Sequence, residues 1–563
     1  MNFTDYPIDN NYILKKKKFL KRIGLDKKNL IQKNIAIVGG STIGDIKDIL
    51  EVFLLDYGIK PDFFIGQYNN FYEDVLFNTQ ELLDFKPDII IIHTTSRNLY
   101  DENLIEKLKA VWGKIDDLFK VPVIQNNFEI YEPTFSKDTN YINTLNSEIY
   151  TYQKKSKNFY VNDISKISSI FGTSNWFNQK DYYMYKYAFA VQAIPFFSFN
   201  LAVIIKSIFG KNQKCIVLDL DNTLWGGVVG DLGVSGIELG METATGEAYI
   251  TFQKYVKNLH SKGIILAVCS KNDEKLAKKA FENPNMILKL NDISVFYANW
   301  DDKANNIIKI ADDLNILPES LVFIDDNPAE REIVRQSLPM VKVPEVNNPI
   351  EFIQRIEDAG YFYITNLSNE DINRNEYYSK DIERNKLKNL FVDYGEYLKS
   401  LNMTSTIKPF EQQHIERITQ LINKTNQFNL TTLRYSVAEV EKLCESSNFI
   451  TFYADLDDKF GNNGIVSVFI GEILDNILHI RLWVMSCRVF KRELELAIFD
   501  EIIKKCQEES IQKVNGYYYP TEKNVYVKDL FKDLGFDEVD DSTWEFSTHN
   551  YKNKNKYISI NNQ

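Results

Sequence analysis

Two pairs of carboxylates, each at the end of an apolar run, are the residues of this sequence best suited to chemistry. Asp219 and Asp221 follow a run that begins at Cys215, and Asp325 and Asp326 follow a second such run. Carboxylates held this close repel one another unless a cation or a proton lies between them. Oxygen ligands of this kind favour Mg²⁺, which also bridges to phosphate. With a cation present, the first acid can attack phosphorus and the second can transfer the leaving-group proton.

Both apolar runs are typical of short, buried parallel strands, because they contain β-branched residues and end at turn-forming residues. Side chains two residues apart in a strand point the same way, so Asp219 and Asp221 are directed to one place. In open α/β sheets ligands bind at the carboxyl ends of the strands, where these acids lie. The alternative is a junction in which Asp and Asn only stabilise a turn. Glycines between 226 and 240 predict a flap in place of a helix.

Further residues of the same region could hold phosphate oxygens. Ser270 ends another apolar run and is followed by Lys271, and Lys303 opens a predicted helix. Hydroxyl and ammonium groups stabilise the charge that develops on a transferring phosphoryl group. The alternatives are a helix cap for Ser270 and a solvated surface charge for Lys303.

Taken in this order, the strand-DxDxT, strand-Ser, Lys and strand-Asp-Asp elements resemble the haloacid dehalogenase (HAD) superfamily of phosphotransferases over residues 211–345. The resemblance implies that Asp219 forms an aspartyl-phosphate and that Asp221 acts as acid and base. It implies phosphate-binding roles for Thr223, Ser270, Lys271 and Lys303. It also implies a Mg²⁺ site made of Asp219, Asp325 and Asp326, to which Asp221 contributes its backbone carbonyl. Neither usual insertion point is long enough for a large cap domain, which predicts a site open to a bulky substrate.

The pattern of elements predicts a multidomain α/β protein, since 563 residues are enough for about three domains. Strands alternating with helices predict a parallel α/β domain at 1–205, followed by the Rossmannoid HAD domain at 206–350. A charged helical connector is predicted at 351–400. An α+β domain is predicted at 401–563.

The N-terminal domain resembles the SGNH-hydrolase fold, with Ser41 where that family has its nucleophile and Asn126 or Asn127 near its oxyanion donor. The closing D-x-x-H of that family is absent, because Met184 takes the place of the histidine. His93 lies too early in the chain to replace it. Without a base a serine is a weak nucleophile. We therefore expect Ser41 to cap a helix and this domain to be non-catalytic.

The C-terminal domain resembles the GNAT acyltransferase fold, in which a strand leads into a helix whose N-terminus binds the phosphates of coenzyme A. Here that junction, Trp483–Arg492, lacks the glycine-rich pyrophosphate loop. Arg488 could still meet a phosphopantetheine phosphate, and the alternative is an ordinary strand-to-helix turn. A polar cluster that could line an acyl or carrier site contains Asn426, Gln427 and Asn429.

The composition indicates which kinds of binding partner and which cellular compartment to expect. The net charge of −12 argues against general binding to nucleic acid or to anionic membranes. Five widely spaced cysteines and no Cys/His cluster favour a reducing cytoplasm over disulfides or zinc. The N-terminus lacks the pattern of a signal peptide. The apolar stretch 187–209 contains polar residues that would be costly in lipid, which predicts a buried connecting helix.

Longer strings narrow the resemblance further. They begin at Leu218 (LDLDNTLWGGVVG), Ala267 (AVCSKND), Phe323 (FIDDNPAERE), Lys424 (KTNQFNLTT) and Met485 (MSCRV). Together they are similar to the FkbH-like proteins, HAD subfamily IIIC, over nearly the whole chain. This resemblance implies an enzyme that takes a glyceryl unit from 1,3-bisphosphoglycerate and loads it onto the phosphopantetheine arm of an acyl carrier protein.

An acyl group of this kind needs a thiol, and two cysteines could form a transient thioester. Cys269 lies beside Ser270, and Cys487 is flanked by Arg488, which favours a thiolate. Core packing is the alternative for both, because free cysteines are commonly buried. Two other functions stay open: a stand-alone phosphatase acting on a sugar or acyl phosphate, and a scaffold that docks carrier proteins without chemistry.

Overall fold

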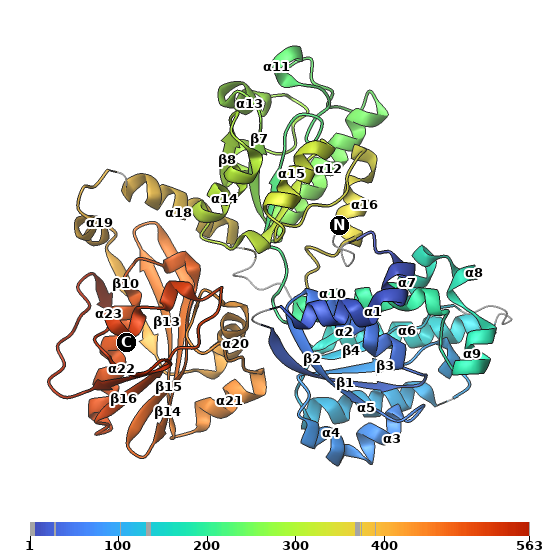
Figure 1. Ribbon diagram of the computed structural model, residues 1–563, viewed down its shortest axis with the longest axis horizontal. Helices are drawn as coiled ribbons and strands as arrows, with labels where there is room; N and C mark the ends of the chain where they lie inside the picture. Colours follow the sequence, from blue (N-terminus) through green and yellow to red (C-terminus); the bar gives the residue numbers. More distant parts are fainter. Residues whose placement is uncertain are drawn as a thin grey trace. The chain divides into compact units, whose positions relative to one another are not determined.

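The computed structural model describes residues 6–27, 30–101, 103–130, 137–365, 372, 374–388 and 390–561. Apart from two short segments, the chain divides into two compact units, one ending at Lys211 and one beginning at Asn212. The first unit therefore extends beyond the predicted domain end at 205, because the helix there continues to Ile208. Figure 1 shows the α/β and α+β layers that the multidomain prediction required.

The N-terminal unit is built on a parallel sheet with the strand order β2-β1-β3-β4-β5. Its strands are β1 (Ile31–Gly39), β2 (Ile59–Ile65), β3 (Ile89–His93), β4 (Val123–Asn126) and β5 (Phe159–Asn162). Its helices are α1 (Asn10–Leu25), α2 (Gly44–Asp56), α3 (Phe71–Leu76), α4 (Thr79–Phe85), α5 (Leu104–Leu118), α6 (Lys137–Lys155), α7 (Ile164–Phe171), α8 (Thr173–Trp176), α9 (Gln179–Tyr185) and α10 (Ile194–Ile208). This is the parallel α/β layer that the sequence predicts.

Both faces of this sheet are buried, which explains why its strands read as continuous apolar runs. Ile35 and Ile37 of β1 belong to one core, whereas Ala36 and Val38 belong to a second core on the opposite face. Side chains alternate along a strand, so a sheet covered on both sides needs apolar residues at every position.

The helix α10 is part of the first of these cores. Among the described residues, Val191–Ile208 is the one helical stretch apolar and long enough to cross a membrane, but 72% of it is buried inside the unit. It packs on α2, and its Phe197 and Ala202 are fully buried. The prediction of a buried connecting helix is therefore confirmed.

The central domain has a smaller parallel sheet with the order β8-β7-β6-β9. Its strands are β6 (Cys215–Leu218), β7 (Ile265–Ser270), β8 (Val295–Ala298) and β9 (Leu321–Ile324). Its helices are α11 (Val229–Leu232), α12 (Ala244–Ser261), α13 (Glu274–Ala280), α14 (Lys303–Asp313), α15 (Pro328–Ser337) and α16 (Phe352–Asp358). The glycine-rich flap holds one short helical turn, α11, and is otherwise the turn-rich segment predicted. The register pairs Leu218 with Ile324, so the residues that follow β6 and β9 leave the sheet side by side.

The predicted helical connector contains α18 (Arg374–Lys388) and α19 (Tyr394–Ser400). Arg384 of α18 donates to both carboxylate oxygens of the buried Asp458, at 2.8 and 2.9 Å. This bidentate pair joins α18 to the domain that follows.

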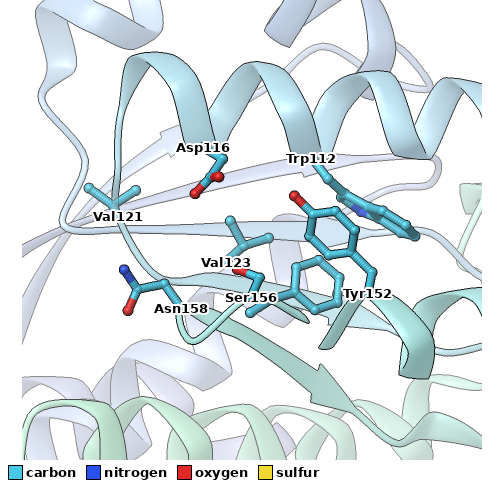
Figure 2. Close-up of a pocket in the computed structure, with 8 residues that line it drawn as sticks. Trp112, Asp116, Val121, Val123, Tyr152, Ser156 and Asn158 are labelled. Atoms are coloured by element: carbon cyan, nitrogen blue, oxygen red, sulfur yellow. The ribbon is translucent and has the colours of Figure 1, made fainter. Parts of the chain in front are cut away.

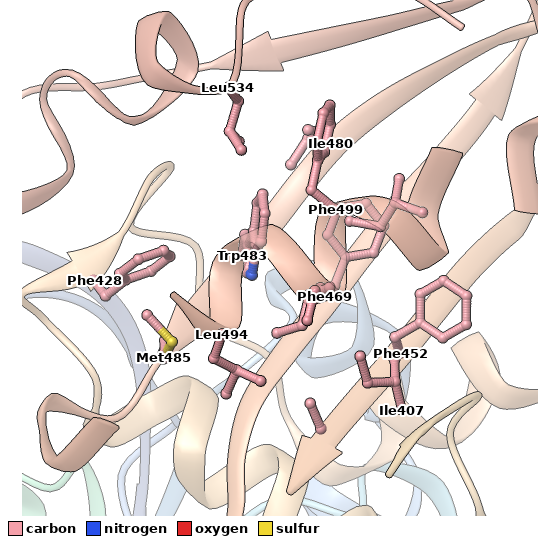
Figure 3. Packing of buried hydrophobic residues seen from close by; sticks show 14 of the residues in the cluster. Ile407, Phe428, Phe452, Phe469, Ile480, Trp483, Met485, Leu494, Phe499 and Leu534 are labelled. Atoms are coloured by element: carbon pink, nitrogen blue, oxygen red, sulfur yellow. The ribbon is translucent and has the colours of Figure 1, made fainter. Parts of the chain in front are cut away.

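The C-terminal domain is the predicted α+β domain, with the strand order β17-β18-β16-β15-β14-β13-β10-β19. Its strands are β10 (Met403–Ser405), β11 (Ile407–Lys408), β12 (Phe428–Asn429), β13 (Phe449–Asp458), β14 (Gly461–Leu474), β15 (Ile477–Met485), β16 (Lys513–Tyr517), β17 (Asp537–Asp540), β18 (Thr543–Ser547) and β19 (Ile558–Ile560). Its helices are α20 (Ile415–Lys424), α21 (Val437–Glu445), α22 (Leu494–Glu508) and α23 (Leu530–Asp533). Aromatic and aliphatic side chains of β13, β14 and β15 pack against α22 to form its core (Figure 3).

Candidate active site

Three of the four predicted acids converge at the carboxyl edge of the central sheet. One carboxylate oxygen from each of Asp219, Asp325 and Asp326 lies within 4.8 Å of the others. Asp219 follows β6 and the other two follow β9, so the pairing of these strands brings the acids together. Asp219 is 6% exposed and Asp325 is fully buried. Buried carboxylates at this spacing form a site for a hard cation.

Lys303 supplies the positive side chain of this cluster. Its Nζ lies 3.2 Å from Asp219 Oδ1 and 2.5 Å from Asp325 Oδ2. Lys303 is only 3% exposed, so the alternative of a solvated surface charge does not apply. Burial by itself lowers the pKa of Lys303, but Asp219 and Asp325 together raise it above its usual range. The lysine is therefore held charged beside the acids.

One lysine does not balance three acids. Burial raises the pKa of Asp219 and of Asp326, and burial together with the charge of Asp219 raises the pKa of Asp325 to about 6. Asp219 Oδ1 is buried and accepts no hydrogen bond from any residue that the structure describes. With the Lys303 ammonium 3.2 Å away and no hydrogen bond from a described residue, this oxygen can still accept a cation, and the all-oxygen donor set of the three acids suits Mg²⁺.

The remaining HAD-motif side chains support these acids in different ways. Ser270 ends β7 and its hydroxyl stabilises the ionised form of Asp219, which lowers the pKa of that acid against the larger effect of burial. The Thr223 hydroxyl accepts a hydrogen bond from the backbone N–H of Asp326 at 3.3 Å. Thr223 thus holds the backbone of an acid, whereas the sequence predicts that it holds phosphate.

Asp221 is held apart from the cation cluster. Its Oδ1 accepts hydrogen bonds from Trp225 Nε1 at 2.8 Å and from the Val229 N–H at 3.0 Å, and its Oδ2 accepts one from Asn272 Nδ2 at 2.9 Å. Its carboxylate is not one of the three that approach one another, and the resemblance assigns only its backbone carbonyl to the metal. Nothing in the sequence pattern singles out Trp225, since its contact arises from the tight turn after β6.

Two predicted residues of β7 and its loop do not join the site. Lys271 Nζ is 2.6 Å from Glu330 Oε1 and is half-exposed, so its charge is used by an ion pair. Cys269 is fully buried in the core of the domain, and burial raises the pKa of its thiol to about 12. Because side chains alternate along a strand, Cys269 and Ser270 point to opposite faces. The burial of Cys269 therefore argues against the transient thioester predicted for it.

The predicted residues of the C-terminal junction face other parts of their own chain. Arg488 stacks over the ring of Tyr377, 4.3 Å from its centroid, and its Nε donates to Ser486. Cys487 is half-buried in the short turn between β15 and α22, and this turn packs against α18. These contacts place both side chains against the connector helix α18, not in an acyl-binding site.

The polar cluster of this domain is also used internally. Asn426 accepts from Arg434 Nη2 at 2.6 Å, and Gln427 lies half-buried in the turn before β12. Asn429 is fully buried; its Oδ1 accepts from the Thr432 N–H and its Nδ2 donates to the Thr425 carbonyl. Its strand β12 pairs with the end of β15. The three residues predicted to line an acyl site thus stabilise the fold of this segment.

In the N-terminal unit, Ser41 and His93 meet in a buried hydrogen bond. Ser41 Oγ is 2.9 Å from His93 Nε2, and His93 Nδ1 is 3.0 Å from Asn126 Nδ2. Ser41 therefore does not cap α2, whose N-cap residue is Ile43. Sequence order misled here, because parallel β1 and β3 place Ser41 and His93 at the same edge although the histidine comes early in the chain.

The direction of these hydrogen bonds decides what the pair can do. Asn126 Nδ2 also donates to the Thr94 carbonyl, and Asn126 Oδ1 accepts from Asn162 Nδ2 at 2.8 Å. This fixes the amide with its N–H toward His93 Nδ1, so Nδ1 accepts and Nε2 carries the proton. Burial lowers the pKa of His93 to about 4, which keeps the ring neutral. His93 then donates to Ser41 and cannot act as its base.

Other polar residues of this edge are likewise paired. Asn127, the alternative oxyanion donor of the sequence prediction, donates to Asp163 Oδ1 at 2.7 Å and to Tyr150. A small hollow of this unit, between Trp112, Tyr152 and Asn158, lies at the opposite edge of the sheet (Figure 2). It is formed where β4 and β5 begin, away from the ends at which α/β sheets bind ligands.

Comparison with solved structures includes a match over much of the chain. The N-terminal part of the protein BF1531 from Bacteroides fragilis, which contains a phosphatase domain and is complexed with Mg, is 32% identical to this chain. The match covers 62% of this chain and 99% of that one, with a TM-score of 0.58. No protein-family model and no curated protein matches the sequence.

Acetyltransferases match a smaller part of the chain. A ribosomal-protein-S18-alanine N-acetyltransferase from Escherichia coli and a GNAT-family acetyltransferase from Staphylococcus aureus are 11% and 13% identical. Each match covers 26% of this chain and 99% of the other, with a TM-score of 0.21. Likeness at this identity concerns the fold only.

Proposed function

Because this chain belongs to the family of BF1531, whose N-terminal part contains a phosphatase domain, we propose that it is a Mg²⁺-dependent HAD-type phosphatase. The observation that carries the proposal is the convergence of Asp219, Asp325, Asp326 and Lys303 at one edge of the central sheet. A group of buried acids with one lysine is costly to maintain in a purely structural role. It suits the transfer of a phosphoryl group, which is catalysed mainly by positioning and charge.

The side chains divide the chemistry among them. Asp219 attacks phosphorus through one of its carboxylate oxygens, so that an O–P bond forms to the carboxylate and the bond to the leaving group breaks. Lys303 and Ser270 hold the phosphoryl oxygens. Asp221 transfers the proton to the leaving group and takes one from the incoming water that cleaves the aspartyl-phosphate. Mg²⁺, held by Asp219, Asp325 and Asp326, would neutralise phosphate charge.

The flap contacts of Asp221 favour this division of roles. Three donors hold its carboxylate away from the cation cluster, so it is free of the charges that fix Asp219. Two of the donors come from the segment that follows β6, so the position of Asp221 depends on the flap. The acid that moves protons is thus oriented by the part of the chain that a substrate would first meet.

The finer proposal is the glyceryl transfer typical of the FkbH-like proteins. In it, a thiol attacks the acyl phosphate carbon of 1,3-bisphosphoglycerate and expels phosphate, and the Asp219 site hydrolyses the remaining phosphate ester. The burial of Cys269 favours direct attack by the phosphopantetheine thiol of an acyl carrier protein. The short segment between β6 and α12, with α11 as its helix, leaves room for such a bulky partner.

Mass spectrometry tests this proposal. The full chain is incubated with Mg²⁺, 1,3-bisphosphoglycerate and a phosphopantetheinylated carrier, and a glyceryl adduct is expected on the carrier arm. Asp219→Asn and a carrier that lacks the arm are the matched controls. Phosphate release that does not require the carrier and leaves no adduct would instead establish the stand-alone phosphatase.

A further inference from the structure

A buried arginine lies behind the loop that carries two of the three acids. Arg331 stands near the start of α15 and is fully buried. Its Nη1 donates to the carbonyl oxygens of Asp325 at 2.8 Å, of Asp326 at 2.7 Å and of Val346 at 2.7 Å. One guanidinium nitrogen thus meets the backbone of both acids that follow β9.

These two carbonyls have left the sheet and need a donor from elsewhere. The ladder of β9 ends at Ile324, whose carbonyl accepts from the Asp219 N–H at 2.9 Å. A buried carbonyl without a partner is costly, and in this loop Arg331 supplies the partner to two peptide units in succession. Because the direction of a side chain follows its backbone, fixing both peptide units fixes where Asp325 and Asp326 point.

The cap of α15 places Arg331 where it can do this. Asn327 Oδ1 accepts from the Ala329 N–H at 2.9 Å, and Pro328 occupies the first position of the helix. Both features are typical of a well-defined helix start. The helix therefore begins immediately after the acids, and its first turn brings Arg331 back beneath them.

The other guanidinium nitrogen of Arg331 is held by side chains on its own side of the loop. Its Nη2 contacts Glu345 Oε2 at 3.0 Å and Asn347 Oδ1 at 2.7 Å. Glu345 also binds Arg335, at 2.6 Å. These contacts fix the plane of the Arg331 guanidinium behind the acidic loop.

From these contacts we propose that Arg331 is the positioning residue of the cation site, holding Asp325 and Asp326 in the geometry that binds the metal. The inference rests on the proposed Mg²⁺ site and assigns Arg331 no contact with substrate. Residues that orient metal ligands in this way typically change metal affinity by about 10- to 100-fold when they are replaced.

The test compares Arg331→Lys and Arg331→Met with Arg335→Met in the full chain. Arg335 is the matched control, since it lies on the same helix and shares Glu345 but donates to the Val343 carbonyl. Isothermal titration with MgCl₂ measures affinity without turnover, and thermal melts identify which variants are folded. Phosphatase assays over a range of Mg²⁺ concentrations separate the Mg²⁺ requirement from kcat.

We expect both Arg331 variants to bind Mg²⁺ at least tenfold more weakly than Arg335→Met and to recover kcat at high Mg²⁺. If Arg331→Met does not fold, the test rests on Arg331→Lys, which keeps the positive charge but lacks the two guanidinium nitrogens that donate hydrogen bonds. Unchanged Mg²⁺ affinity in a folded Arg331 variant overturns the inference and leaves the proposed function intact. Absence of Mg²⁺ binding by the unaltered protein overturns both.

Discussion

The N-terminal and central sheets both collect polar side chains where their parallel strands end, but they satisfy them differently. At the carboxyl end of the N-terminal sheet, Ser41, His93 and Asn126 are joined by hydrogen bonds whose donors and acceptors match. At the central edge, Asp219 and Asp325 share Lys303, and Asp219 Oδ1 accepts no hydrogen bond from a described residue. The polar groups of the N-terminal sheet satisfy one another, whereas the acids of the central sheet require a cation.

This difference shows that a serine next to a histidine does not by itself indicate activity. The direction of the hydrogen bonds around the two side chains decides whether the histidine can act as a base. The amide of Asn126 gives His93 the tautomer that donates to Ser41, so proximity produces a stable structure without a base. Buried acids without matching donors store unfavourable energy that a ligand can release. We therefore place the chemistry at the acids of the central sheet.

The largest expected effect separates the two edges by activity. Asp219→Asn removes the nucleophile and should lower phosphatase kcat by on the order of 10³-fold or more, as loss of a nucleophile typically does. Ser41→Ala should leave kcat within about twofold, because the Ser41 hydroxyl bonds His93 and has no role in the proposed reaction. Steady-state kinetics with a generic phosphate monoester measure both variants.

The comparison would be reversed by the opposite pattern. A Ser41→Ala variant that loses most activity while Asp219→Asn keeps it would move the catalytic site to the N-terminal unit. Thermal melts of both variants exclude loss of folding as the cause of either result.

A smaller effect is expected from Asp325→Asn, which weakens the repulsion between Asp219 and Asp325. Without Mg²⁺ the variant should be as stable as the unaltered protein or more stable by about 1–2 kcal/mol, the range typical of removing unfavourable charge. Its melting temperature should no longer rise when Mg²⁺ is added. Calorimetry with and without Mg²⁺ measures both, and a full Mg²⁺-induced rise would contradict the role given to Asp325.

Much of this division could be predicted from the sequence. The runs before Asp219 and Asp325 are short, apolar and bounded, so they specify strands, and parallel pairing then brings their ends together. Lys303 and Ser270 follow from the same rule, because each lies at the end or the start of an element at that edge. Local patterns thus determine which backbone positions meet.

They do not determine what each side chain meets. The alternation of β7 alone indicates that Cys269 faces away from Ser270, but the ion pair of Lys271 with Glu330 depends on the packing of α15. The roles of Arg331 and Thr223 depend likewise on carbonyl and N–H groups of a loop distant in sequence. A pattern of residue types carries no information about such tertiary hydrogen bonds.

The stability of the protein should depend on pH through the buried His93 of the N-terminal sheet. Burial lowers the pKa of His93 from 6.5 to about 4, so below pH 6.5 the unfolded chain takes up a proton that the folded one does not. The stability contributed by neutral His93 is present above pH 6.5 and is lost as the pH falls through 4, by about 3 kcal/mol. Denaturant titrations from pH 7 to pH 4 should show a smaller loss for His93→Gln by about that amount. Equal losses in both proteins would contradict the neutral, buried assignment.

The smallest expected effect is a reversal of the hydrogen bond between Ser41 and His93. Asn126→Asp replaces the donor that faces His93 Nδ1 with an acceptor, so Nδ1 should take the proton and Nε2 should become able to accept from Ser41. The variant should lose about 1–3 kcal/mol of stability, because the new carboxylate is buried and faces the Thr94 carbonyl. Nitrogen-15 NMR of the histidine ring distinguishes the tautomers directly. If the unaltered protein already shows the Nδ1-protonated form, His93 Nε2 can accept the Ser41 proton as a base. The contrast between the two sheets would then be lost.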